Sequence, residues 1–296
     1  MKQFNLLRWL TPLALLLAIG TAVWVFQATA SLSPGMKRRA QLGFHHGLDQ
    51  PGLAVQLART PAEFCAIFGL IDPDPEKRTK LTETERTQAV KDSAPDREAV
   101  IGSLHRDFLF IPAYTLLWIV LGLRAWQRTA PHSTAVRVSL LVIPLAVALG
   151  DVLENFADLS ALKSYPAIDA STLVRGSTAS WGKWLLSFME MIVLGISLLR
   201  VDGPRPRAFL PNLGGLMLLS GGAFGLSSVF WPSFIPNAFG LGLLAALPFS
   251  ALVFSPDFAW RVRCTPGDLT WRGPAAGVCK IAPAKGPLTA TSARSA

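Results

Sequence analysis

Long apolar runs alternate with polar segments along this chain, and the lengths of these runs are the first guide to its fold. A helix needs roughly 20 consecutive apolar residues to cross the hydrocarbon core of a bilayer. The pattern predicts an all-α, polytopic membrane helix bundle of about six transmembrane helices. The runs are Leu6–Phe26, Phe108–Leu123, Val138–Leu153, Trp184–Leu199, Phe209–Phe230 and Ala238–Phe254.

The first two runs are separated by a polar segment in which start signals for helices recur. Thr60-Pro61-Ala62-Glu63 is a capping box with proline at the first helical position. A helix that begins near Ser93 is expected to continue into the second span. We therefore divide the chain into a first transmembrane helix, a small helical extracytoplasmic segment, a five-helix membrane bundle and a largely disordered cytoplasmic tail. Their bounds are 1–30, 31–103, 104–254 and 255–296.

The first run also fits a second interpretation. Lys2 lies before it, Arg8 lies close to its start, and Ala28-Thr29-Ala30 follows it, which is the pattern of a cleavable signal peptide. The run is longer than the usual apolar region of such a peptide, and Trp24 and Phe26 suit an interfacial anchor. We favour an uncleaved helix, and cleavage stays open as the alternative.

The placement of basic residues predicts the orientation. The chain has a formal net charge of +9, and six spans bring its N-terminus, two short loops and its tail to one face. That face carries 14 basic and 3 acidic residues, whereas residues 31–107 carry 11 of each. Lys and Arg accumulate in cytoplasmic loops. We expect both termini in the cytoplasm and residues 31–103 outside the inner membrane of a bacterium. Topology thus accounts for the basic pI, and no nucleic-acid partner is predicted.

Ionisable side chains inside spans are costly, so each needs a partner or a function. Glu190 stands in the middle of an otherwise apolar run. Lys183, Ser187 and Glu190 follow one another at spacings of four and three residues, which places them on one helix face. This face is expected to point into the bundle.

The two preceding spans carry acids at overlapping depths. Asp151, Glu154 and Asn155 share a face at i, i+3 and i+4, while Asp107 and Tyr114 share a face of the second span. We expect these residues to converge with Lys183 and Glu190 into an ion or proton pathway. Arg106 and Arg175 are further candidate partners for the acids.

The residue types at this depth limit the chemistry. Oxygen ligands would suit Mg²⁺, Mn²⁺ or Ca²⁺ better than zinc, because no His or Cys lies at matching depth. No span has a histidine in its interior to bind haem. The sequence predicts no cofactor, and we assign no metal site.

Two short motifs carry a resemblance. Asp107-Phe108-Leu109-Phe110 with Tyr114, followed by Asp151-Val152-Leu153-Glu154-Asn155, resembles a pattern in uncharacterised bacterial multi-span inner-membrane proteins. The pattern can be written D-F-x-F-x(3)-Y and D-x-x-E-N, and it covers under a fifth of the chain. The resemblance implies no known activity.

Three functions stay open on these observations. The first is a small transporter or proton/cation-coupled protein that uses the intramembrane carboxylates. The second is an accessory or sensory subunit whose extracytoplasmic segment binds a protein partner. The third is a membrane-embedded enzyme that uses a divalent metal on a lipid or envelope substrate. The bilayer is the expected environment in each case, and a homo-oligomer is compatible with six spans.

Overall fold

A computed structural model describes residues 2–42, 48, 50–72, 81–128, 134–199 and 205–254 of the chain. Every regular element in these ranges is a helix. The predicted tail, 255–296, lies outside the described residues.

Six long helices form the membrane part. Five are long and apolar enough to cross a membrane, and the sixth, α10, has 20 residues and no charged side chain. The predicted all-α membrane bundle of about six helices is confirmed. The helices are α1 (Lys2–Ala30), α6 (Ala94–Arg128), α7 (Thr134–Ser164), α8 (Ala170–Leu199), α9 (Arg205–Leu226) and α10 (Ile235–Phe254).

Two spans are longer than their apolar runs. The run that begins at Trp184 belongs to a helix that begins at Ala170, and the run that ends at Leu153 belongs to a helix that ends at Ser164. The added turns carry Ser, Thr, Asp and Lys, which a search for apolar runs passes over. Two of their polar side chains bind neighbouring helices, since Lys183 donates to Asp151 and Glu154 of α7 and Asn155 donates to Asp107 of α6.

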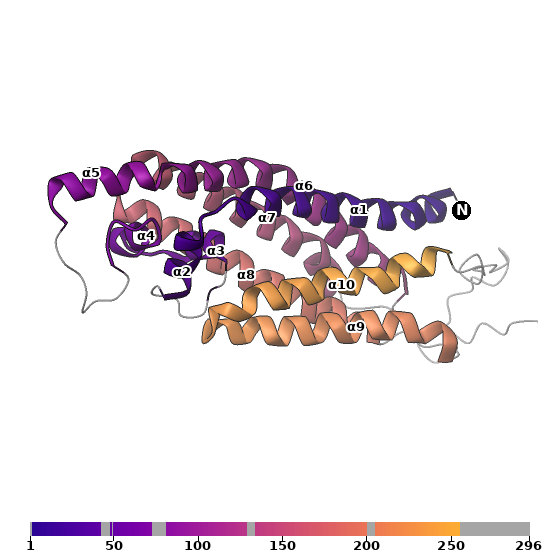
Figure 1. The fold of residues 1–296 in the computed structure, drawn as a ribbon. Coiled ribbons are helices and arrows are strands. Elements are labelled where there is room, and N and C mark those ends of the chain that lie inside the picture. Colours follow the sequence, from indigo (N-terminus) through magenta and orange to yellow (C-terminus); the bar gives the residue numbers. More distant parts are fainter. Residues whose placement is uncertain are drawn as a thin grey trace, which may run out of the picture. The chain divides into compact units, whose positions relative to one another are not determined.

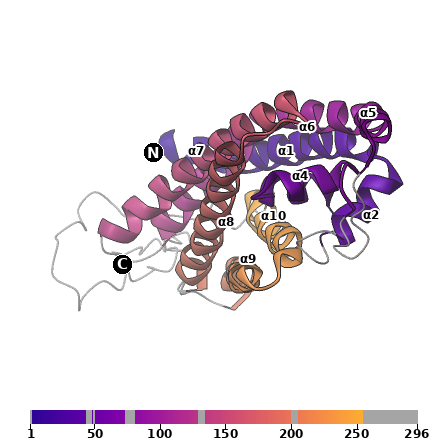
Figure 2. The same ribbon diagram turned by 90° about the vertical axis from the view of Figure 1, so that its left-hand side faces the viewer.

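The six helices pack as a ring. Each one contacts the next along the chain, and α10 contacts α1 to close the ring. Further contacts join α6 and α10 to α8, which therefore has the most neighbours. Figure 2 shows α8 crossing beside α7, with α9 and α10 to the right of its lower half. Two short 3₁₀ helices, Ser227–Val229 and Pro232–Phe234, connect α9 to α10.

Glycines set the closest approaches between these helices, as the small-residue spacing of the last two spans indicates. A Cβ atom added to Gly221 would lie 3.1 Å from the carbonyl oxygen of Ala238 on α10. One added to Gly195 would lie 2.8 Å from the carbonyl oxygen of Gly215 on α9. These distances are below normal contact, so α8, α9 and α10 pack backbone to backbone at these points.

Four short helices follow α1 and gather at the end of the bundle opposite the N-terminus (Figure 1). Helix α3 contacts α7 and α8, and five of its seven residues are buried. The buried core of this segment includes Met36, Leu48, Phe64 and Phe68. The four helices are α2 (Pro34–Leu42), α3 (Pro51–Leu57), α4 (Pro61–Ile67) and α5 (Glu83–Asp92).

The capping box and the helix start that the sequence predicts in this segment are both formed. Thr60 accepts a hydrogen bond from the backbone of Glu63, whose side chain accepts one from the backbone of Thr60, so the capping box is formed. A second capping box joins Thr82 and Glu85 at the start of α5. Helix α6 begins at Ala94 and continues without a break into its membrane part, as expected.

One polar contact fastens the segment to α6. The carboxylate of Asp96 accepts hydrogen bonds from the backbone N–H of Ser33 at 2.8 Å and from its hydroxyl at 2.6 Å. The guanidinium of Arg39 lies 3.9 Å from Asp96 and donates to the carbonyl of Ile67. Asp96 thereby joins the start of α2 to the start of α6.

An aromatic contact joins the segment to the α7–α8 connection. The ring of Phe68 lies 5.5 Å from that of Tyr165, and the Arg97 guanidinium lies 4.7 Å from the centre of the same ring. Burial raises the pKa of Tyr165 to about 12, so this side chain packs as a neutral phenol.

The glycine contacts give a first prediction. Gly195→Ala places a methyl group against the backbone of α9, and we expect it to lower the free energy of unfolding by about 1–3 kcal/mol, the usual cost of overpacking. Gly182 is the matched control, because a Cβ at this position on the same helix meets nothing within 4 Å. Thermal unfolding in detergent measures both. Equal stabilities for Gly195→Ala and Gly182→Ala would contradict the close α8–α9 contact.

Candidate functional site: a buried carboxylate–lysine cluster

A lysine shared between two carboxylates lies between α7 and α8. The Nζ atom of Lys183 donates a hydrogen bond to the carboxylate of Asp151 and another, of 2.8 Å, to Oε1 of Glu154. Relative exposures are 5% for Lys183, 5% for Asp151 and 0% for Glu154. All three groups are therefore removed from solvent. An unpaired charge in such a buried position would cost several kcal/mol.

Spacing on α7 and small residues at the α7–α8 contact create this cluster. Asp151, Glu154 and Asp158 follow at i, i+3 and i+7, so they share one face. A Cβ on Gly150 would lie 3.2 Å from Cβ of Lys183, and one on Gly176 would lie 3.0 Å from Cβ of Ala157. The helices can therefore approach closely enough for the lysine to reach two successive turns of α7.

Helix α6 contributes the second layer of the cluster. The hydroxyl of Tyr114 donates to Oδ2 of Asp151 at 2.8 Å, and Nδ2 of Asn155 donates to Oδ2 of Asp107 at 2.7 Å. Asp151 thus accepts hydrogen bonds from both neighbouring helices. The expected convergence of the acids on these three helices is observed for Asp107, Asp151, Glu154, Asn155, Tyr114 and Lys183.

Negative charge exceeds positive charge in this cluster. Asp107, Asp151, Glu154 and Asp158 all lie close enough to Lys183 to interact with it electrostatically. Among the described side chains, Lys183 is the one cation bonded to any of them. Carboxylates that share a buried site cannot all stay ionised without compensating positive charge. The arrangement can therefore hold protons or a cation in addition to Lys183.

Glu190 does not join the cluster. It lies two turns from Lys183 along α8, about 10 Å at the rise of an α-helix, and it is 2% exposed. Its Oε1 has no hydrogen-bond partner. Ser187, between the two, donates instead to the backbone carbonyl of Lys183. Glu190 faces the bundle interior as expected, but as a separate buried group rather than the centre of the acid cluster.

Two residues of the site were not among the predicted ones. Asp158 is 2% exposed and Ser180 is 0% exposed, and each has an oxygen with no hydrogen-bond partner. The apolar run of the third span ends at Leu153, which left Asp158 outside it. The i+7 spacing from Asp151 and the four-residue spacing from Gly176 to Ser180 were the signals that could have identified them.

The two arginines considered as partners bind elsewhere. Arg106 donates to the carbonyl of Trp24 at 2.9 Å and lies over the Trp24 ring, so it joins α6 to α1. Arg175 is exposed and donates to Ser171 one turn earlier on α8. Both face away from the acids because they lie on other faces of their helices.

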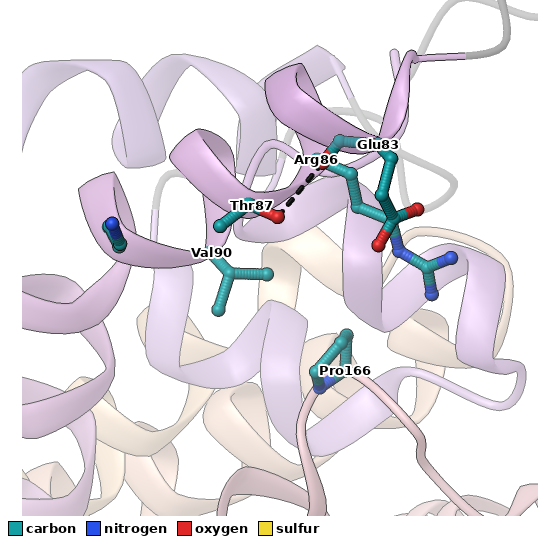
Figure 3. A pocket seen from close by; sticks show the side chains of 6 residues that line it. Glu83, Arg86, Thr87, Val90 and Pro166 are labelled. Carbon is teal, nitrogen blue, oxygen red and sulfur yellow. Dashed lines mark hydrogen bonds between the residues drawn. The ribbon is translucent and has the colours of Figure 1, made fainter.

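A surface depression of about 480 Å³ lies between α5 and the α7–α8 connection (Figure 3). Its α5 lining includes Glu83, Arg86 and Thr87, which are exposed, and Thr87 donates to the backbone carbonyl of Glu83. Val90, Lys91 and Pro166 complete it. None of the residues that line this depression belongs to the buried cluster.

No group of three or more His, Cys, Asp or Glu side chains that could hold a metal ion occurs in the ranges that the structure describes. No protein-family model, curated protein or solved structure matches the chain. Function must therefore be argued from the cluster itself.

The shared lysine gives a second prediction. Lys183→Met leaves Asp151 and Glu154 buried without their cation, and we expect a loss of about 3–5 kcal/mol of stability, the usual cost of breaking a buried pair. Lys163→Met, at an exposed position on α7, is the control. Adding Asp151→Asn and Glu154→Gln to Lys183→Met should restore part of the loss. Thermal unfolding in detergent tests this, and equal stability of the two lysine variants would show that the pairing is not formed.

Proposed function

We propose that the chain is a small proton-coupled transporter of the bacterial inner membrane. The observation that carries this proposal is the excess of acids over Lys183 between α6, α7 and α8. A lysine that served only to tie two helices together would need one carboxylate. Here Lys183 is bonded to two, and Asp107 and Asp158 lie close by. Charged groups in membrane interiors commonly mark ion or proton pathways.

The proposed chemistry is the gain and loss of a proton on the acids that share Lys183. When Glu154 takes up a proton, it no longer offers a full negative charge to the ammonium, and Lys183 is held by Asp151 alone. When the proton leaves, both bonds re-form. Because Glu154 lies on α7 and Lys183 on α8, each proton changes the attraction between two helices. This is the coupling that alternating access requires.

Glu190 has a separate role in this proposal. A carboxylate that is 2% exposed and lacks a partner for Oε1 is far cheaper to bury in its neutral form. It lies on the same stripe of α8 as Lys183 and Ser187, two turns away. We assign it to an inner position on the proton path, which begins at the cluster.

The orientation follows from charge. The face with 14 basic and 3 acidic residues is placed in the cytoplasm, and α2–α5 are placed outside. Helix α3 lies against the ends of α7 and α8 on the outer side, so the cluster would open towards the extracytoplasmic segment.

The third prediction tests this topology. Thr84→Cys on exposed α5 and Arg294→Cys in the tail, each with Cys65, Cys264 and Cys279 replaced by serine, are treated in intact cells with a membrane-impermeant maleimide. Thr84→Cys should react, and Arg294→Cys should react only after the cells are permeabilised. The reverse pattern would invert the assigned orientation.

The fourth prediction tests proton transfer. Liposomes containing the purified protein and an entrapped pH indicator should acidify faster than empty liposomes under an imposed inward proton gradient and a compensating potassium potential. Glu154→Gln and Glu190→Gln should reduce the rate to that of empty liposomes, because an amide takes up no proton. Glu98→Gln, exposed on α6, is the control. Normal flux through well-inserted Glu154→Gln would refute the proton role of the cluster.

A second candidate function is an accessory or sensory subunit. The observation that favours it is the way in which the cluster ties α6, α7 and α8 together, as Tyr114, Asp151 and Lys183 do, beneath a packed external segment. In that case the acids are structural, and a protein partner or a second copy of the chain binds α2–α5. Glu154→Gln would then reduce accumulation in the membrane, and the wild-type liposomes would show no added flux.

A further inference from the structure

We infer that the contact between α7 and α8 contains a binding site for a small monovalent cation, of the size and charge of sodium. Its ligands are Oε2 of Glu154, Oδ2 of Asp158 and Oγ of Ser180. These three atoms belong to the cluster but take no part in the bonds of Lys183. The inference deepens the proposed function by naming a second coupling ion beside the proton.

The placement of the three side chains follows from contacts at two levels of α8. A Cβ on Gly176 would lie 3.5 Å from Oδ1 of Asp158, which puts Asp158 beside that glycine. Glu154 is bonded through Oε1 to Lys183. Gly176, Ser180 and Lys183 follow at spacings of four and three residues and share one face. Ser180 therefore lies between the levels at which the two acids meet α8.

All three oxygens are buried and lack a partner. Relative exposures are 0% for Glu154, 2% for Asp158 and 0% for Ser180, and Oε2, Oδ2 and Oγ have no hydrogen-bond partner. A buried polar atom without a partner costs about 1–3 kcal/mol, and a charged one costs more. Three such atoms along one helix contact indicate a ligand that all of them bind. Two of them are carboxylate oxygens, so the ligand is a cation.

The number of available oxygens favours a monovalent ion. Asp107, Asp151, Glu154 and Asp158 carry four negative charges when all are ionised, against one on Lys183, so an added cation of either charge reduces the imbalance. The three unpartnered oxygens are too few for the coordination shell of a divalent ion. Calcium takes six to eight oxygens and magnesium a strict octahedron, and no three-acid metal group occurs in the described ranges.

Glu154 connects this ion to the rest of the cluster. Its Oε1 accepts from Lys183 and its Oε2 is left for the ion, so protonation of Glu154 weakens both interactions. The ion and the proton therefore compete for one carboxylate. Because ion binding is measured on protein in detergent, its failure can be distinguished from a failure of proton transport.

The fifth prediction measures binding directly. Thermal unfolding of the purified full-length chain is followed in sodium chloride and in choline chloride at equal ionic strength, with lithium and potassium chloride as further arms. A ligand that binds only the folded state raises its stability with concentration. We expect the melting temperature to rise and saturate with sodium but not with choline. Sodium NMR line broadening on addition of protein gives an independent measure of the same binding.

Matched variants assign the ligands. Ser180→Ala should raise the sodium Kd about tenfold, the equivalent of 1.4 kcal/mol. Ser177→Ala should leave it unchanged, because Ser177 is a buried serine of the same helix whose hydroxyl already donates to Val174. Asp158→Asn should abolish sodium binding, and Asp92→Asn, exposed on α5, should not.

Several results would overturn the site. Equal stabilisation in sodium and choline would do so, and so would the same sodium Kd for Ser180→Ala and Ser177→Ala. Stabilisation that depends on pH alone would show that the ligand is a proton. If Asp158→Asn does not fold, the two serine variants and the NMR line widths decide the question.

Discussion

The buried ammonium of Lys183 is the constraint on which the membrane part depends. Lys183 is the one basic residue in the buried stripe of α8, and an unpaired charge there would cost more than most single contacts in a protein contribute. Its partners must come from another helix, because the neighbouring residues of α8 offer none. Asp151 and Glu154 supply them, and this fixes both the antiparallel register of α7 against α8 and their closeness at Gly150 and Gly176.

The contacts of this pair extend in two directions. Towards α6, Tyr114 binds Asp151, and Asn155 binds Asp107, so a third helix is held to the same level. Along the contact with α8, Asp158 continues the line of acids, close to Lys183 but without a hydrogen bond to it. The contacts towards α6 hold helices together, because each hydrogen-bond donor there has an acceptor. Along the contact with α8, Oε2 of Glu154 and Oδ2 of Asp158 have no hydrogen-bond donor. Packing alone does not require a buried acid without a donor in a membrane interior.

The rest of the fold supplies rigidity around this contact. Glycines bring α9 against α8, where Gly215 and Gly195 meet, so α8 is also held on another face by close backbone contacts. In the segment of short helices, α3 contacts α7 and α8, and Asp96 fastens the segment to α6. The cluster side chains are buried (Lys183 5%, Asp151 5%, Glu154 0% exposed), which strengthens the charge interactions between them.

The sequence by itself determined the fold class, the capping boxes and the stripe of α8 on which Lys183 and Glu190 lie, because apolar run length, capping motifs and helical periodicity are local properties. It also predicted that acids of three helices would meet. Only the tertiary structure decided that Lys183 binds Asp151 and Glu154, that Arg106 turns to α1, and that Glu190 stands apart. These outcomes depend on the relative rotation and register of helices, which are set by glycine contacts and by charge pairing across the bundle. The bonds of Lys183 join residues 29 and 32 positions apart, and Arg106 meets Trp24 82 positions away, so local patterns do not encode these contacts.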